Sequence, residues 1–548
     1  MATTQFHTRN VMDIIKAVLI FCIAGALYYL LLQWPDEPES TKLVGGEESK
    51  QSFFKEGISD SEDLLLSMDP DPERSPPPTV IGRVFSIEND DTKVSIEALT
   101  GRVVSSFLKQ IYTDQVSGQP LLILGSTERN LYFANSGYFN RELGYINPNY
   151  TNLKRVDVPE GLRYVLTGES NNMVFRRTIN MKRSGHSLEI TEAVTSKQDK
   201  PLEITPYVVI ERDSSPPQED GLAMTYLGPV FSTEKDVYQK YDFGDINSAP
   251  YREKSKGGWV AFIQHYFLSA WIPAQEKESF YQGRWSNSSN RYTVGYTLKD
   301  EVLLPGGSLS HTNVLYVGPK YPYELAEIQE NLSLTVDYGF LWWLGKPMYW
   351  FLSIGNELFK SWGLAIVFLT VVLKFLLWPL SAKAYRSMGK MREFGPELQS
   401  IQARYGNDKQ KSAQEMMDLY KREGINPLGG CLPMLLQMPF FLAFYWVLME
   451  TVELRHSPFL WIDDLSAKDP YFILPILNGV GMYLSQMLTP TPPNADPLQA
   501  QMMKYFPVVF AVIFAWFPSG LVLYWLVNMF LQIGQQWWYG RSTQNQRS

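Results

Sequence analysis

The 548-residue sequence predicts a polytopic α-helical membrane protein that also carries a large all-β sandwich domain. Apolar runs long enough to cross a bilayer as helices recur after residue 340, and another lies near the N-terminus. Between them, residues 79–335 hold short runs in which apolar and polar residues alternate, as half-buried strands require. We therefore expect an N-terminal anchor, an outer β domain and a bundle of five spanning helices.

The N-terminal region predicts an uncleaved membrane anchor followed by a tether. Residues 17–32, AVLIFCIAGALYYLLL, follow Arg9 and Lys16 and lack the small-residue cleavage pattern of a signal peptide. We assign residues 1–34 to a transmembrane anchor. Residues 35–78 are rich in Pro, Glu, Asp and Ser, a composition that cannot offset the entropy of ordering, and predict a disordered acidic linker.

The β domain is predicted from its alternation and its turns. The runs VFSIEND, KVSIEAL and RYTVGYTL alternate apolar and polar residues, and turn-forming clusters such as residues 88–91 and 305–307 separate such runs. Strands recur without long helices between them, which favours an antiparallel sandwich over residues 79–335. Its aromatic residues suit core packing, with a carbohydrate-binding surface as the less usual alternative.

Residues 336–361 mix tryptophan and tyrosine with lysine, which is typical of a membrane interface. Because Pro347 and Gly355 interrupt the run, we expect an amphipathic helix lying on the outer membrane surface rather than a span.

The first predicted span of the bundle, residues 362–380, has the sequence WGLAIVFLTVVLKFLLWPL and contains one lysine, Lys374. Such a charge costs about 2.5–3.5 kcal/mol at a helix centre, so Lys374 marks a polar interior by default. Thr370 and Trp378 lie four residues either side and share its face. The alternative is a lysine that reaches the headgroup layer along its own methylenes.

The rest of the chain predicts a helical hairpin and four more spans. Residues 381–427 carry two amphipathic repeats, the first with Pro396 near its middle, where we expect a kink. Residues 428–540 contain the remaining spans, and residues 541–548 form a short tail. Because the hairpin is rich in Lys and Arg, the positive-inside rule puts it and both termini in the cytoplasm and the β domain outside.

Several classes of function receive no support from the sequence. The net charge of −8 argues against general nucleic-acid binding. The five histidines show no metal-site spacing, and we expect neither a metal nor a cofactor. A protease would need a nucleophile and a base, but the spans contain no histidine beside Ser485 or Ser519. A transporter or channel that uses Lys374 stays open, although no inverted repeat is visible. A passive scaffold that anchors the β domain is a further alternative, but one span would suffice for that role and the sequence predicts six.

Three motifs in the bundle carry a family resemblance. They are NPLGGCLPMLLQMPFFLAFYWVLM at residues 426–449, LSAKDPYFILPIL at 465–477 and WFPSGLVLYW at 516–525. In the outer domain, GGWVAFIQHYFLSAWIP at 257–273 is similar too. With these motifs in this order, the chain resembles the YidC/Oxa/Albino family of membrane protein insertases, in the form with a large outer domain that Gram-negative bacteria have.

The resemblance implies a five-helix core around a hydrophilic groove that is open to the cytoplasm and to lipid. One positive residue lines that groove, usually arginine, and Lys374 occupies its position here. This change keeps the charge but loses the planar fork of donors. The other residues implied in the groove or in substrate contact are Thr370, Gln437, Met438, Phe441, Tyr524 and Trp525.

The resemblance also implies a function and partners. The protein would insert and help fold inner-membrane proteins without enzymatic chemistry, and its β domain would lie in the periplasm. Implied partners are nascent membrane proteins, the Sec translocon (SecYEG and SecDF), membrane lipids, and ribosomes with their targeting factors. Because the tail at residues 541–548 is only weakly basic, we expect ribosomes to dock on the hairpin.

Overall fold

The structure is a computed structural model, and it describes residues 82–113, 118–126, 131–215, 226–286, 290–405, 408–424, 432–488 and 497–545. The predicted anchor and linker lie outside the described residues, as do residues 425–431 and the last three residues of the tail.

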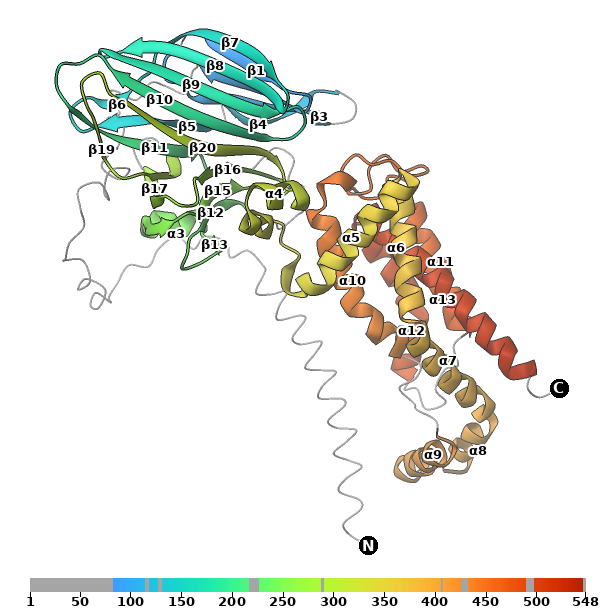
Figure 1. The fold of residues 1–548 in the computed structure, drawn as a ribbon. Helices are drawn as coiled ribbons and strands as arrows, with labels where there is room; N and C mark the ends of the chain where they lie inside the picture. Colours follow the sequence, from blue (N-terminus) through green and yellow to red (C-terminus); the bar gives the residue numbers. More distant parts are fainter. Residues whose placement is uncertain are drawn as a thin grey trace, which may run out of the picture. The chain divides into compact units, whose positions relative to one another are not determined.

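Two antiparallel sheets form the β domain (Figure 1). One sheet has eleven described strands: β1 (Val84–Glu88), β2 (Thr92–Glu97), β3 (Val103–Tyr112), β4 (Pro120–Ser126), β5 (Leu131–Asn140), β6 (Gly144–Ile146), β11 (Leu202–Arg212), β14 (Tyr251–Lys256), β17 (Glu278–Ser286), β18 (Arg291–Thr297) and β19 (Glu301–Leu303). The other has nine: β7 (Tyr150–Val158), β8 (Gly161–Ser170), β9 (Met173–Lys182), β10 (Ser187–Ser196), β12 (Gly228–Ser232), β13 (Gln239–Lys240), β15 (Trp259–Ile263), β16 (Phe267–Pro273) and β20 (Ser308–Pro319).

The strand order mixes neighbours in sequence with long crossovers. The first sheet runs β1-β2-β3-β4-β5-β11-β18-β17-β14, with β6 on β5 and β19 on β11. The second runs β13-β12-β15-β16-β20-β10-β9-β8-β7. The predicted all-β sandwich is therefore confirmed.

The first hairpin shows how the sequence pattern produces this fold. In β1 the buried residues Phe85 and Ile87 alternate with exposed ones, so one face of the strand packs into the core. The Asn89 side-chain oxygen accepts hydrogen bonds from the backbone N–H groups of Asp91, at 3.1 Å, and Thr92, at 2.7 Å. This Asx-type turn directs the chain back into β2.

The sandwich core holds large aromatic side chains and one buried ion pair. Trp271 is fully buried, and its indole N–H donates to the carbonyl of Val209 at 3.1 Å across the two sheets. Arg177 on β9 and Glu192 on β10 pair at 2.6 Å, with side chains 1% and 8% exposed. Sequence alternation accounts for the aromatic residues, but it gave no sign of a charge pair in the core.

The other regular elements of the described chain are helices. The α-helices are α3 (Phe243–Ser248), α4 (Pro322–Ile328), α5 (Trp342–Phe359), α6 (Trp362–Leu376), α7 (Trp378–Glu393), α8 (Gly395–Tyr405), α9 (Lys409–Glu423), α10 (Leu432–Glu450), α11 (Ile473–Leu488), α12 (Pro497–Phe514) and α13 (Ser519–Asn545). Three short 3-10 segments are η1 (Glu330–Thr335), η2 (Gly339–Leu341) and η4 (Val452–Leu454).

Three helix boundaries differ from the sequence prediction. The predicted span over residues 362–380 is broken at Leu377, where α6 and α7 meet at 62°. Pro379 has no N–H to bond the carbonyl four residues back, and its ring disfavours a straight continuation. At Pro396 the helix does not kink but stops at Glu393 and restarts at Gly395. At the C-terminus, α13 continues to Asn545, into the predicted tail.

Helix α5 also corrects an expectation, because neither Pro347 nor Gly355 interrupts it. Gly355 instead lets α5 approach α6 closely. A Cβ atom at Gly355 would lie 3.0 Å from the Cα of Ala365 and 3.0 Å from the ring of Phe368. Gly355, which the sequence pattern suggested as a helix breaker, therefore allows α5 and α6 to pack closely.

This close approach predicts a position-specific effect of one substitution. Gly355→Leu should destabilise the protein by about 1–3 kcal/mol, because the added side chain overpacks the α5–α6 contact. Gly534→Leu on α13 is the matched control, since a Cβ there meets nothing within 4 Å, and it should be neutral or stabilising by a few tenths of a kcal/mol. Thermal unfolding of the purified protein in detergent measures both variants. Equal melting temperatures would contradict this role for Gly355.

Candidate functional site

The candidate site lies among three helices of the bundle. α13 packs against both α6 and α10. α6 contributes Thr370 and Lys374, which are 1% and 8% exposed and lie one turn apart on one face. The Thr370 hydroxyl donates to the carbonyl of Ile366 at 2.7 Å, so it is satisfied within its own helix.

The side chain of Lys374 is buried, and its ammonium group has no counter-ion in the described part of the chain. No described residue forms a hydrogen bond or an ion pair with its Nζ atom. A buried lysine of this kind is costly unless water or a ligand solvates it. The ammonium group of Lys374 can therefore attract a negatively charged group that enters the site.

The other two helices contribute one polar pair and a cluster of aromatic rings. The side-chain amide of Gln437 on α10, 7% exposed, donates to the hydroxyl of Tyr524 on α13, which is fully buried. Phe441 on α10 meets Trp525 on α13 edge to face, with ring centroids 5.1 Å apart. Phe514 of α12 packs on both rings, at 6.4 and 5.7 Å.

The structure thus brings four of the seven predicted residues into two direct pairs. Gln437 pairs with Tyr524, and Phe441 pairs with Trp525. Lys374 and Thr370 share a face of α6, and Met438 is half-buried on α10. Between Tyr524 and Trp525, the tyrosine makes the polar contact to α10, whereas the tryptophan belongs to the aromatic cluster.

Sequence reasoning missed further polar residues in the bundle. Asn528 and Gln535 on α13 are each 4% exposed. They follow Tyr524 by four and eleven residues, a spacing that returns to one face of a helix and could have revealed them. Asn478 on α11 is fully buried and donates to the carbonyl of Val522 at 3.1 Å. The side-chain carbonyl oxygens of Asn478 and Gln535 are buried without a partner in the described residues.

The chemistry that this arrangement supports is polar solvation rather than covalent catalysis. It combines one cation, amide groups and a phenol in an otherwise apolar bundle. Among the described residues, no group of three or more His, Cys, Asp or Glu side chains could hold a metal ion. The site can lower the cost of burying a polar or acidic chain segment.

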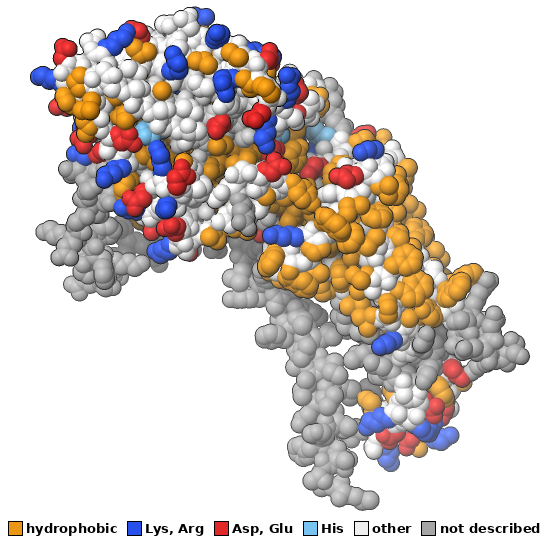
Figure 2. Space-filling view, viewed as in Figure 1, with side chains coloured by type: hydrophobic (Ala, Val, Ile, Leu, Met, Phe, Trp, Pro, Cys, Tyr) orange, Lys and Arg blue, Asp and Glu red, His pale blue; other side chains and the backbone are white. Residues whose placement is uncertain are grey.

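Apolar side chains cover much of the outside of the helical bundle. Figure 2 shows these side chains gathered over the helices, whereas charged side chains are spread over the β domain. Exposed residues include Leu376, Val480, Val508 and Trp516, with fractions between 53% and 69%. Among the described helices none alone is both long and apolar enough to span a bilayer, but the bent pair Trp362–Leu376 and Trp378–Tyr385 is by length and composition.

Two family models match successive parts of the chain. Residues 84–351 match the family model described as YidC periplasmic domain, and residues 354–546 match that of the 60Kd inner membrane protein. The membrane protein insertase YidC of Marinomonas sp. (strain MWYL1) is 38% identical over 541 residues, covering 95% of this chain and 97% of the relative. That of Pasteurella multocida (strain Pm70) is 37% identical over 536 residues, covering 96% and 97%.

Among solved structures, an active YidC insertase crystal structure with its first transmembrane domain resolved aligns with 15% identity and a TM-score of 0.40, over 86% of this chain and 97% of that one. The fold and the site define a class of protein in which an all-β sandwich is joined to a helical bundle with apolar outer faces and a buried lysine. The sequence matches are specific: the chain belongs to the YidC family, which are inner-membrane protein insertases and not enzymes.

Proposed function

We propose that this protein inserts inner-membrane proteins and helps them fold, alone or beside the Sec translocon, through a hydrophilic groove whose positive charge is Lys374. The observation that carries the proposal is the buried side chain of Lys374, whose ammonium group has no acidic partner among the described residues. In a family of insertases, a substrate is the natural source of the missing negative charge.

The groove would act by solvation. The polar flank of a nascent segment would enter beside Lys374 and Gln437, where water and fixed donors reduce its desolvation cost. Its apolar helix would move to lipid along the α10 face that carries Met438 and Phe441. The membrane potential supplies about 2.3 kcal/mol per charge per 100 mV and favours outward movement of acidic flanks. This is close to the insertion cost of one charged residue, so we expect short, lightly charged flanks to be the preferred clients.

We propose a topology with the β domain in the periplasm and the α8–α9 hairpin and both termini in the cytoplasm. The exposed apolar faces of the bundle support a location in lipid for its helices. The exposed Trp342, Trp343 and Trp350 of α5 support a place at the membrane surface. The positive-inside rule supports the orientation, because the hairpin sequence is rich in Lys and Arg.

We also propose that the hairpin receives ribosomes or targeting factors. Its helices α8 and α9 pack through their own small core of Leu398, Met416 and Leu419, so the hairpin forms a separate packed unit. Its outer surface carries charged residues such as Arg404 and Lys421. Residues 395–424 carry five Lys and Arg against five Asp and Glu, so the excess of positive charge in residues 381–427 lies on α7, where Lys383, Arg386, Lys390 and Arg392 are accompanied only by Glu393. This basic stretch would suit a partner with an acidic surface.

The proposal is tested by reconstitution. The purified protein is placed in liposomes, and a single-span substrate with a short acidic N-terminal tail is added. Protease protection of the tail is compared with that in empty liposomes. Protection that needs the protein supports insertase function, whereas protection equal to that in empty liposomes, with folded protein and a competent substrate, contradicts it. A transporter that uses Lys374 would instead give solute flux without tail protection.

A further inference from the structure

A buried ion pair joins the β domain to the end of helix α10. Lys320 follows the last strand, β20, and its Nζ atom contacts the carboxylate of Glu450, the last residue of α10. The two side chains are 3% and 8% exposed. A cation at a helix C-terminus also interacts favourably with the helix dipole. The insertion mechanism described above makes no use of this pair.

The same helix end has a second contact with the β domain. The His265 Nε2 atom, in the turn between β15 and β16, lies 2.8 Å from the carbonyl oxygen of Met449. Because a carbonyl can only accept, the imidazole must be the donor. A continuous cluster of buried apolar residues also runs from Trp259 and Leu268 on these strands to Phe444 on α10.

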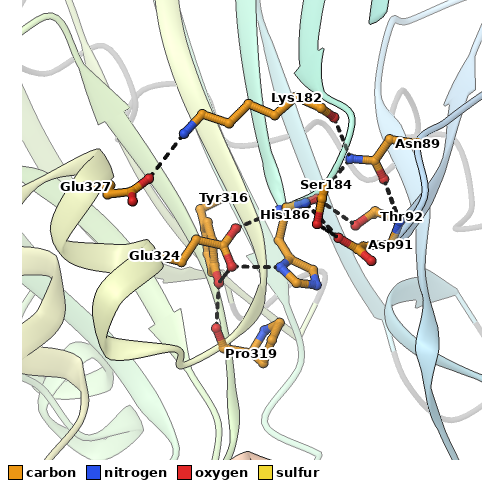
Figure 3. Close-up of polar contacts among 11 residues, drawn as sticks. Asn89, Asp91, Thr92, Lys182, Ser184, His186, Tyr316, Pro319, Glu324 and Glu327 are labelled. Carbon is orange, nitrogen blue, oxygen red and sulfur yellow. Dashed lines mark hydrogen bonds and ion pairs between the residues drawn. The ribbon is translucent and has the colours of Figure 1, made fainter. Parts of the chain in front are cut away.

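Residues near Lys320 in the sequence make hydrogen bonds within the β domain, and Figure 3 shows those of Tyr316, Pro319 and Glu324. Glu324 of α4 accepts from the backbone N–H of His186 at 2.7 Å, and its other carboxylate oxygen lies 2.9 Å from the His186 Nδ1 atom. The Tyr316 hydroxyl donates to the carbonyl of Pro319 at 2.5 Å. On one side of Lys320 a hydrogen bond holds the end of β20, and on the other side Glu324 joins α4 to the turn before β10.

The chain at the end of α10 also contacts helix α5. The Tyr349 hydroxyl on α5 donates to the carboxylate of Glu453 at 2.7 Å, just after α10. Burial raises the pKa of this carboxyl group. Contacts from the β domain and from α5 thus meet at one end of the helix that carries Gln437 and Phe441.

We infer that the β domain positions α10 in the bundle through the Lys320–Glu450 pair, and so sets the placement of Gln437 and Phe441 in the groove. This inference rests on the proposed function. Glu450 and Gln437 are thirteen residues apart on one helix, about 20 Å along its axis, and a tilt at one end therefore displaces the other. Lys320, Glu450 and His265 act as positioning residues and do not touch the substrate.

The test uses the full chain in liposomes and two readouts, insertion rate and hydrogen exchange. Lys320→Met leaves Glu450 buried without its partner, and we expect insertion to slow about tenfold. Hydrogen exchange should increase in the last turns of α10 but not in β9 and β10. Lys182→Met is the matched control, because its pair with Glu327 is 67% and 69% exposed, and it should change neither readout.

A charge-reversed pair, Lys320→Glu with Glu450→Lys, guards against simple misfolding. We expect this double variant to recover insertion to within about threefold of the wild type and to restore exchange protection in α10. It is overturned if Lys320→Met matches the wild type in both readouts, or if exchange rises throughout the sandwich and the reversed pair rescues nothing. If the wild type itself inserts nothing above empty liposomes, the proposed function fails, while the exchange comparison still decides the positioning role.

Discussion

Lys374→Glu is expected to slow the insertion of a substrate with an acidic tail by about 100-fold, while a neutral tail loses less than about threefold. At an effective dielectric constant of 20, two unit charges 4 Å apart interact by about 4 kcal/mol. Reversing the charge removes an attraction and adds a repulsion, and even with screening by groove water about 3 kcal/mol should remain, which is roughly 100-fold. The measurement is protease protection of paired acidic and neutral tails in liposomes.

Lys346→Glu is the control for this experiment, because Lys346 is an exposed lysine on α5 that stacks over Trp342. It carries the same charge change outside the candidate site and should leave the ratio of acidic to neutral insertion unchanged. Equal insertion of the two tails by Lys374→Glu would remove the electrostatic role of this residue. It would then be a lysine that reaches toward the headgroups.

Arg177→Ala is expected to destabilise the β domain by about 3–5 kcal/mol, because it leaves the Glu192 carboxylate buried without its partner. Arg177 also donates to the carbonyl of Ser136 at 2.9 Å and to that of Gly101, and the Ser136 hydroxyl donates to Glu192 at 2.5 Å. Its loss therefore leaves several buried acceptors unsatisfied at once. Hydrogen exchange of β9 and β10 in the full-length protein measures the change in the free energy of unfolding.

The matched control for this loss is Arg155→Ala on β7. Arg155 pairs with Asp157 at 3.4 Å, but the two side chains are 54% and 66% exposed. An exposed pair of this kind contributes less than about 1 kcal/mol. Loss of protection that is equal in the two variants would show that the buried network adds nothing specific to the sandwich.

The parts of the fold that sequence predicts are those with local signals. Alternation in runs such as residues 84–88 specifies a strand with one buried face, and the predicted sandwich follows from many such runs. Glycine and proline within a predicted helix are harder to interpret, because their effect depends on what packs against them. Gly355 reads as an interruption but provides a close helix contact, while Pro379 in an apparently continuous span marks a 62° bend.

The candidate site was only partly predictable for a similar reason. Lys374 is conspicuous because a charge stands out in an apolar run, and the family resemblance supplied the residues on α10 and α13. The contact between Gln437 and Tyr524 joins positions 87 residues apart, and no periodicity encodes it. The Lys320–Glu450 pair spans 130 residues and was equally invisible. Long-range polar pairs depend on how the helices and sheets pack, which a single sequence does not specify.

The central claim is that an inserting tail passes beside Lys374, and photo-crosslinking of the wild-type protein tests it most directly. A photoreactive amino acid is placed in the acidic tail of the substrate, insertion is started in liposomes, and the crosslinked residues are identified by mass spectrometry. The account predicts crosslinks to the buried face of α6 at Thr370 and Lys374 and to Gln437 on α10. Crosslinks confined to the exposed residues Phe375 and Leu376 of the same helix, which are 68% and 69% exposed, would contradict it.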